Sequence, residues 1–169
     1  APVTLVNGEV VDYGLVGDID GIDGSVVTRL LDSGFLPVVS PLSCDSSGQL
    51  LNINADTVAA AIGGALVAEK LILCTGAPGI LERVDDPQSL ISYTDLAGLH
   101  RLREKGAITD GMLPKSSAIE AAIRGGVRRV HVISYAETDS LLAEIFTNEG
   151  KGTLVVADTK ALPAAEQGQ

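Results

Sequence analysis

Three polar side chains precede an apolar stretch rich in Ala and Gly. Asn52, Asn54 and Asp56 alternate just before residues 57–68, whose larger apolar side chains recur at helical spacing. The first backbone N–H groups of a helix have no partner within the helix, so two amides and an acid at this point could orient a polar ligand. The same residue types are also the ordinary N-caps, so Asn54 or Asp56 could serve only to cap the helix.

A lysine lies where helices seldom carry one. Pro114 fits only in the first turn of a helix, so Lys115 must lie close to a helix N-terminus, where the helix dipole disfavours a cation. A bound anion such as a phosphate would offset the unfavourable interaction between the lysine and the helix dipole. The alternative is a lysine that extends into solvent, because the dipole penalty is under about 1 kcal/mol.

A Gly- and Pro-containing loop follows a short apolar run. Residues 70–75 are typical of a buried strand, and residues 76–79 read Gly-Ala-Pro-Gly. Ligands of open α/β folds bind in such loops at the carboxyl edge of a parallel sheet, although turn chemistry alone would give the same residues. The sequence has no P-loop Gly-Lys-Ser/Thr and no Gly-x-Gly-x-x-Gly, which argues against Walker-type and dinucleotide sites.

The scaffold for these residues alternates strands and helices. The patterns predict a hairpin from residues 3–6 and 10–13 and strands at 35–40, 70–75, 90–93, 130–134 and 153–156. They predict helices at 25–33, 57–68, 95–105 and 138–146, and one more helix that follows the loop at 108–111 and ends at residue 124. The helix at 57–68 has almost no polar face and should be buried on most sides. The alternation predicts an α/β fold, a three-layer αβα sandwich with a mostly parallel central sheet.

Composition limits the partners. The 169 residues are 46% hydrophobic and 3% aromatic, which favours a core of Val, Leu, Ile and Ala. A net charge of −10 argues against binding to nucleic acid or an anionic membrane. No apolar run approaches 18 residues and no signal peptide is visible, so we expect a soluble, cytoplasmic protein.

Longer motifs resemble those of the N-acetylglutamate kinases of the amino-acid-kinase superfamily. Order and spacing match over residues 52–56, 70–81 and 108–115, and over the flanking residues 13–17, 36–41 and 152–155. The resemblance covers about residues 10–157, and it is most specific in Asn52–Asp56 together with Pro114-Lys115.

The resemblance implies phosphoryl transfer from ATP to the side-chain carboxylate of N-acetyl-L-glutamate in arginine biosynthesis, with Mg²⁺ bridging the phosphates. Lys115 would neutralise the charge of the transferring phosphoryl group, and Asp56 would orient the lysine side chain. Asn52 would hold the polar end of the small-molecule substrate, and Asn54 would support that site. No residue is assigned as a metal ligand. The nucleotide site would be lined by Gly76, Ala77, Pro78, Gly79, Ile80, Leu81, Ala107, Ile108 and Thr109.

A further resemblance concerns regulation. Residues 130–134 and 141–153 are similar to the segments around the arginine-inhibitor site of arginine-sensitive members, and the matching positions are His131, Glu144 and Gly150. An acid suits a guanidinium ligand. The alternative is a buried strand histidine and a solvated helix glutamate.

Two departures from the family pattern shape the expected domain organisation. Gly76 stands where the family usually carries Asp, and the N-terminal Lys-x-Gly-Gly strand and the second Gly-Gly phosphate loop are absent. We therefore expect residues 1–69 to be the remaining part of a substrate-binding lobe, 70–157 a nucleotide-binding lobe, and 158–169 a disordered tail. As a fragment, the chain alone should be inactive.

Two alternative functions and one expectation about assembly remain at this point. The acceptor could be N-acetyl-aminoadipate instead of N-acetylglutamate. The chain could also be a non-catalytic nucleotide-binding or interaction module that keeps the fold. Apolar surface exposed at a truncated edge would favour a homo-oligomer.

Overall fold

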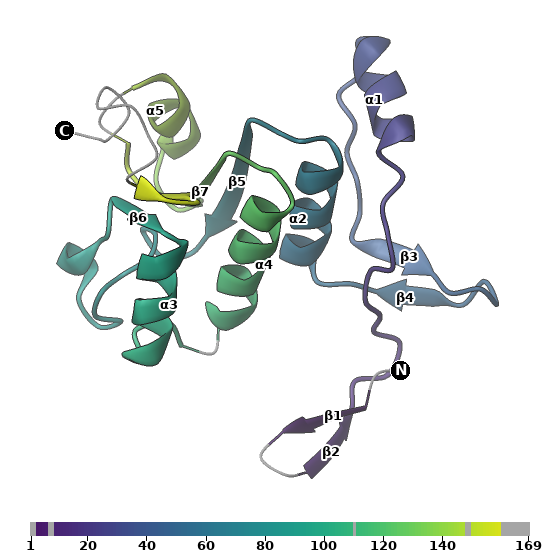
Figure 1. The fold of residues 1–169 in the computed structure, drawn as a ribbon, viewed down its shortest axis with the longest axis horizontal. Helices are drawn as coiled ribbons and strands as arrows, with labels where there is room; N and C mark the ends of the chain where they lie inside the picture. The colour runs from purple at the N-terminus through teal and green to yellow at the C-terminus, as the bar shows by residue number, and fades with distance from the viewer. Residues whose placement is uncertain (1–2, 7–8, 110, 148–149, 160–169) are drawn as a thin grey trace.

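A computed structural model describes residues 3–6, 9–109, 111–147 and 150–159. Its centre is a four-stranded sheet (Figure 1). The strands, in spatial order, are β5 (Lys70–Thr75), β7 (Arg129–Ser134), β8 (Thr153–Val156) and β6 (Tyr93–Asp95). β5 runs parallel to β7 and β6 parallel to β8, whereas β7 and β8 are antiparallel, so the sheet is mixed.

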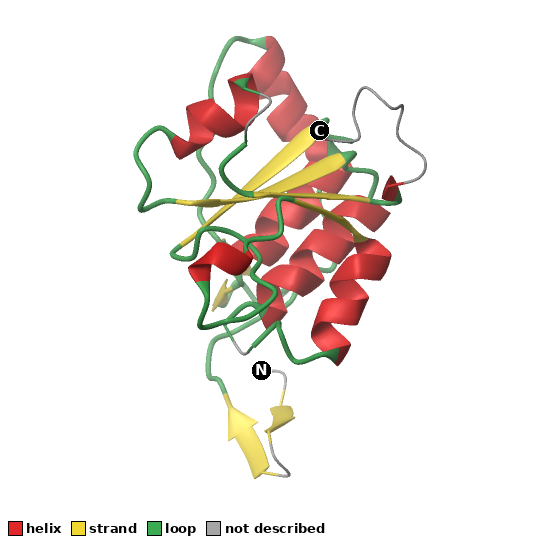
Figure 2. Cartoon of the chain, turned by 90° about the vertical axis from the view of Figure 1, so that its left-hand side faces the viewer, coloured by secondary structure: helices red, strands yellow, loops and turns green. Residues whose placement is uncertain are grey.

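Helices cover both faces of this sheet (Figure 2). On one face, α3 (Leu96–Glu104) and α4 (Leu113–Arg124) pack against the sheet, and α2 (Ala55–Ala65) packs against α4 and β5. On the other face, α5 (Ser140–Phe146) packs against β7. The predicted three-layer αβα fold is confirmed.

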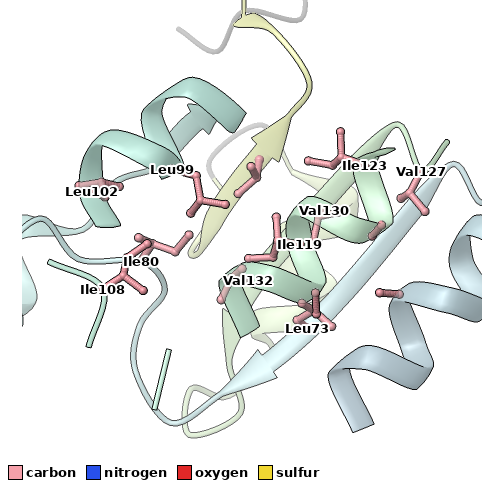
Figure 3. Close-up of a cluster of buried hydrophobic side chains, with 14 residues drawn as sticks. Leu73, Ile80, Leu99, Leu102, Ile108, Ile119, Ile123, Val127, Val130 and Val132 are labelled. Atoms are coloured by element: carbon pink, nitrogen blue, oxygen red, sulfur yellow. The ribbon is translucent and has the colours of Figure 1, made fainter. Parts of the chain in front are cut away.

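The main core lies between the sheet and α2, α3 and α4 (Figure 3). Val130 and Val132 of β7 and Ile119 of α4 are each 0% exposed there. Alternate residues of a strand point to opposite faces, so His131 points to the α5 side instead. Burying one such aliphatic side chain contributes about 1.5–3 kcal/mol.

The chain before residue 53 lies outside the central sheet. It forms the hairpin of β1 (Val3–Val6) and β2 (Glu9–Asp12), then α1 (Gly24–Asp32), then a second hairpin of β3 (Leu42–Cys44) and β4 (Leu50–Asn52). The predicted first hairpin is confirmed, although its turn at residues 7–8 lies outside the described residues. A short 3-10 helix, η1 (Pro87–Ser89), precedes β6.

The strand predicted at residues 35–40 is wrong. This segment is irregular, and Leu36 and Val38 are 88% and 93% exposed. A strand is stable only where a neighbouring strand takes its hydrogen bonds, and no strand of the described chain pairs with this segment. Apolar content alone therefore predicted the wrong structure here.

The predicted burial of the helix at 57–68 is also wrong. α2 starts at Ala55 and ends at Ala65, and only Ala60 and Gly63 are buried. Among the described elements, α4 and β5 make its main contacts, and its other apolar side chains remain partly exposed.

Two observations concern the ends of the fold. Thr159 donates from its backbone N–H and its hydroxyl to Asp95, at 3.3 and 3.0 Å. Residues 160–169 of the predicted disordered tail lie outside the described residues.

Among the helices that the structure describes, none has the length and apolar character that a membrane span needs.

Candidate active site

Lys115 and Asp56 form an ion pair between two helices. The Lys115 ammonium donates to both carboxylate oxygens of Asp56, at 2.8 and 2.9 Å. It also lies 3.4 Å from the carbonyl oxygen of Cys74, near the end of β5. Asp56 is in the first turn of α2 and Lys115 in the first turn of α4, so two helix N-termini and the carboxyl end of a strand meet at this pair.

Burial decides between the two interpretations of Lys115. The residue is 8% exposed, so it does not extend into solvent. Near a helix N-terminus the helix dipole stabilises the Asp56 carboxylate and destabilises the Lys115 ammonium. The ion pair with Asp56 offsets the destabilisation of the ammonium. The arrangement holds one cation in a fixed place beside two helix N-termini, which suits a group that gathers negative charge.

The two asparagines have different positions. Asn54 is the N-cap of α2, and its side-chain oxygen accepts from the backbone N–H of Thr57 at 3.1 Å. Capping therefore accounts for this residue type at position 54. Asn52 ends β4 with an exposed side chain, and its backbone pairs with Leu15 and Gly17. The 13–17 motif thus lies beside Asn52.

The predicted nucleotide residues divide into surface and core groups. Ile80 and Ile108 are 1% and 4% exposed and lie in the same core cluster (Figure 3), so their side chains hold the two loops instead of facing a ligand. Gly79 is buried as well. Gly76 and Thr109 are exposed, and Ala77, Pro78, Leu81 and Ala107 are half-buried. The two predicted loops are therefore neighbours, and part of each reaches the surface.

Thr153 supports this loop, a role that the sequence reasoning missed. Its hydroxyl accepts from the backbone N–H of Ile80 at 2.8 Å. A Cβ at Gly79 would lie 2.7 Å from the same hydroxyl oxygen, so position 79 has no room for a side chain. The inclusion of residues 152–155 in a matching motif was the only sequence signal of this contact.

His131, Glu144 and Gly150 come together on the opposite face of the sheet from α4. The Nδ1 atom of His131 lies 2.7 Å from Glu144, and both side chains are buried. The second carboxylate oxygen of Glu144 accepts from the backbone N–H of Gly152 at 3.0 Å. A Cβ at Gly150 would lie 2.6 Å from that oxygen. The alternative of a solvated helix glutamate is wrong, whereas the buried strand histidine is confirmed.

The protonation of Glu144 follows from these contacts. Burial raises the pKa of Glu144, but the contact with His131 and the backbone N–H groups of Gly152 and Lys151 outweigh it, so the pKa lies below its usual value. The carboxylate is therefore ionised at neutral pH. It ties α5 both to β7 and to the start of β8.

Apolar side chains are exposed along residues 13–50. The most exposed are Val38, Leu36, Phe35, Leu50 and Leu15, at 93%, 88%, 64%, 62% and 59%. An apolar hollow lies between α1, residues 36–41 and α2. Many apolar side chains of residues 13–50 are thus exposed, whereas those of the core around the sheet are buried.

A model of the amino acid kinase family matches residues 1–134. The chain belongs to the amino acid kinase family. This amino acid kinase chain is 47% identical over 161 residues to the acetylglutamate kinase of Myxococcus xanthus, covering 95% of this chain and 52% of that protein. It is 46% identical over 146 residues to the acetylglutamate kinase of Archaeoglobus fulgidus, covering 86% and 50%. The resemblance to acetylglutamate kinases is confirmed, and the chain spans about half the length of the curated relatives it matches.

Solved structures agree on the amino acid kinase fold. The N-acetylglutamate synthase from Neisseria gonorrhoeae, complexed with coenzyme A and L-arginine, matches with a TM-score of 0.81 and 29% identity, covering 94% of this chain and 36% of that chain. The carbamate kinase from Giardia lamblia bound to AMP-PNP matches with a TM-score of 0.64 and 19% identity, covering 81% and 45%. The second likeness concerns the fold alone.

Proposed function

We propose that the protein transfers the γ-phosphoryl group of ATP to the side-chain carboxylate of N-acetyl-L-glutamate, giving an acyl phosphate. The observation that carries this proposal is the pair of buried Lys115 and half-buried Asp56, where two helix N-termini meet the end of β5. The curated relatives at 46–47% identity are named acetylglutamate kinases, which favours this acceptor.

The reaction needs charge neutralisation more than proton transfer. A carboxylate oxygen of the acceptor forms a bond to the γ-phosphorus while the bond from that phosphorus to the bridging oxygen of ADP breaks, and no proton has to move. The Lys115 ammonium would balance the negative charge on the transferring group. Asp56 would hold the ammonium in place through its two contacts.

Mg²⁺ has to be considered with the nucleotide. No group of three or more His, Cys, Asp or Glu side chains within the described ranges is placed to hold a metal ion. The nearby carboxylate of Asp56 is already bonded to Lys115. Because Mg²⁺ commonly binds through one or two carboxylates together with the phosphates of a nucleotide, the ion would come with ATP and neutralise charge on its phosphates.

The remaining assignments complete the proposal. Asn52 would contact the acetylglutamate, and Asn54 would act through the helix that it caps. The surface parts of residues 76–81 and 107–109 would contact the nucleotide. Residues 1–69 would belong to a substrate lobe and 70–157 to a nucleotide lobe. The apolar side chains exposed along residues 13–50 favour pairing with further protein, including a second copy in a homo-oligomer.

The test is a product assay on the complete polypeptide that the gene encodes. With ATP and Mg²⁺, N-acetyl-L-glutamate should give ADP and an acyl phosphate that hydroxylamine traps as a hydroxamate. Glutamate without the acetyl group serves as the control acceptor. The 169 residues alone should give little or no product.

Other results would point to the alternatives. A higher kcat/KM with N-acetyl-aminoadipate would contradict the assigned acceptor. ATP binding without hydroxamate from either acceptor would favour a non-catalytic module. That outcome is physically reasonable, because one fold can carry unrelated functions.

We further propose that His131, Glu144 and Gly150 contribute to an arginine effector site. The support is their convergence around one ionised carboxylate, which could accept a guanidinium. The N-acetylglutamate synthase with the same fold is complexed with L-arginine. Glu144 already contacts His131 and Gly152, so arginine would have to share or displace these contacts.

Glu144→Gln tests the effector site in the complete enzyme. The neutral amide keeps the shape but loses the charge, so the arginine concentration for half-inhibition should rise at least about tenfold. Glu137→Gln is the matched control, because Glu137 is half-exposed and lies 3.5 Å from Lys151. An unchanged arginine response in Glu144→Gln would refute this effector site. A lower melting temperature by itself would reflect only the structural role of the pair.

A further inference from the structure

Tyr135 is an exposed aromatic residue beside the proposed nucleotide loop. Its side chain is 73% exposed, although it directly follows the buried strand β7. The phenolic oxygen lies 3.0 Å from the position that a Cβ of Gly76 would occupy, and the ring atoms Cζ and Cε1 lie 3.5 and 3.9 Å from it. The ring therefore lies over the start of the 76–79 loop.

The backbone of Tyr135 is held firmly. Its N–H donates to the carbonyl oxygen of Thr75 at 3.0 Å, which continues the β5–β7 pairing by one residue. The preceding residue, Ser134, is 5% exposed, and its carbonyl accepts from the buried hydroxyl of Ser140 at 2.6 Å. The exposed ring thus projects from a fixed point at the carboxyl edge of the sheet.

We infer that the Tyr135 ring forms one wall of the nucleotide site, against which the base of ATP lies. This inference rests on the proposed function, because it needs a nucleotide in the 76–81 loop. An aromatic face binds a base through its π-surface, and such stacking tolerates different bases. Gly76 leaves the space that the ring occupies, since any side chain there would start 3.0 Å from the hydroxyl. Lys115 lies nearby at the carbonyl of Cys74, so the phosphates would extend from this wall toward it.

The test measures binding to the complete protein by calorimetry, with ATP and with inorganic tripolyphosphate, which has the phosphates without the base. Tyr135→Ala should weaken ATP binding by about tenfold or more and leave tripolyphosphate binding unchanged. Tyr135→Phe should bind ATP nearly as the wild type does. Phe146→Ala is the matched control, because Phe146 is also an exposed aromatic residue, at 78%, but lies at the end of α5.

A second pair of variants checks the contact with the loop. In Gly76→Ala the new Cβ would press on the phenolic oxygen and displace the ring, so ATP binding should weaken. Adding Tyr135→Phe removes that oxygen and should restore part of the binding. This rescue is not expected if Tyr135 has only a structural role.

The outcomes separate the inference from the proposed function. Wild-type affinity for ATP in Tyr135→Ala would overturn the inference and leave the proposed function standing. Equal losses for ATP and tripolyphosphate would also overturn it, because they would show a general disturbance of the site. Absence of ATP binding to the wild type would overturn both.

Discussion

Replacing Lys115 by methionine in the complete enzyme is expected to lower kcat for phosphoryl transfer by about a thousandfold. The substitution keeps the length of the side chain and removes the charge that would meet the transferring group, and losing one such electrostatic contact costs about 10²–10³ in kcat. KM for the acceptor should change much less, because the lost interaction acts mainly in the transition state. Steady-state kinetics of ADP formation give both parameters.

A loss of folding must be separated from a loss of chemistry. Lys115→Met leaves the Asp56 carboxylate without its cation, and the Asp56 side chain is only 25% exposed. The double variant Lys115→Met/Asp56→Asn removes both charges, so it should recover stability but not activity. Lys105→Met is the matched control, because Lys105 is exposed at the end of α3. Activity within a few fold of wild type in Lys115→Met would rule out the assigned role.

Gly152→Ala is expected to give the largest loss of stability. A Cβ at this buried position would collide with the backbone carbonyl oxygen of Val132 in β7 and would lie 2.9 Å from Cγ2 of Ile133. β7 is an inner strand of the sheet and cannot move without disturbing β5 and β8. Overpacking of this kind costs about 1–3 kcal/mol, and here we expect the upper end, since the obstacle is backbone.

Thermal or urea unfolding measures this loss. Gly21→Ala is the control, because nothing lies within 4 Å of the position that its Cβ would occupy, and its stability should stay within about 0.5 kcal/mol of wild type. Unfolding of Gly152→Ala at the same midpoint as Gly21→Ala would contradict the packing described for β8.

Elements with a strong local signal could be predicted from sequence. β5 at 70–75 and β8 at 153–156 match their predicted ranges, because each is a short apolar run of the kind typical of buried strands. α3 begins after the Asp95 cap and ends before Gly106, where the backbone is left-handed, so its limits were encoded locally. Residues 35–40 carried the same apolar signal as β5 but lack a pairing strand in the described chain, and no local pattern could reveal that.

The family motifs identified the site residues but not their contacts. The sequence indicated that Asp56 and Lys115 belong together, since both occur in motifs of one family. It indicated that Asn54 or Asp56 could cap α2 but not which of the two does so, and it did not indicate that Ile80 and Ile108 are core residues. Tyr135 had no sequence signal, and Thr153 had only its place in the 152–155 motif, because the importance of both depends on the loop that packs beside them.

By itself, the sequence determined the fold class, the family and the residue types of the proposed site. The fold class follows from periodicity and capping, whereas the family and the proposed site residues follow from the resemblance of short motifs to those of a known family. The tertiary structure alone decided that Lys115 is buried against Asp56, although 59 residues separate the two along the chain. It also decided that Glu144 is paired with His131 and that Tyr135 covers Gly76. The physical reason is that burial and ion pairing depend on which elements pack together, and packing brings distant residues to within 3 Å.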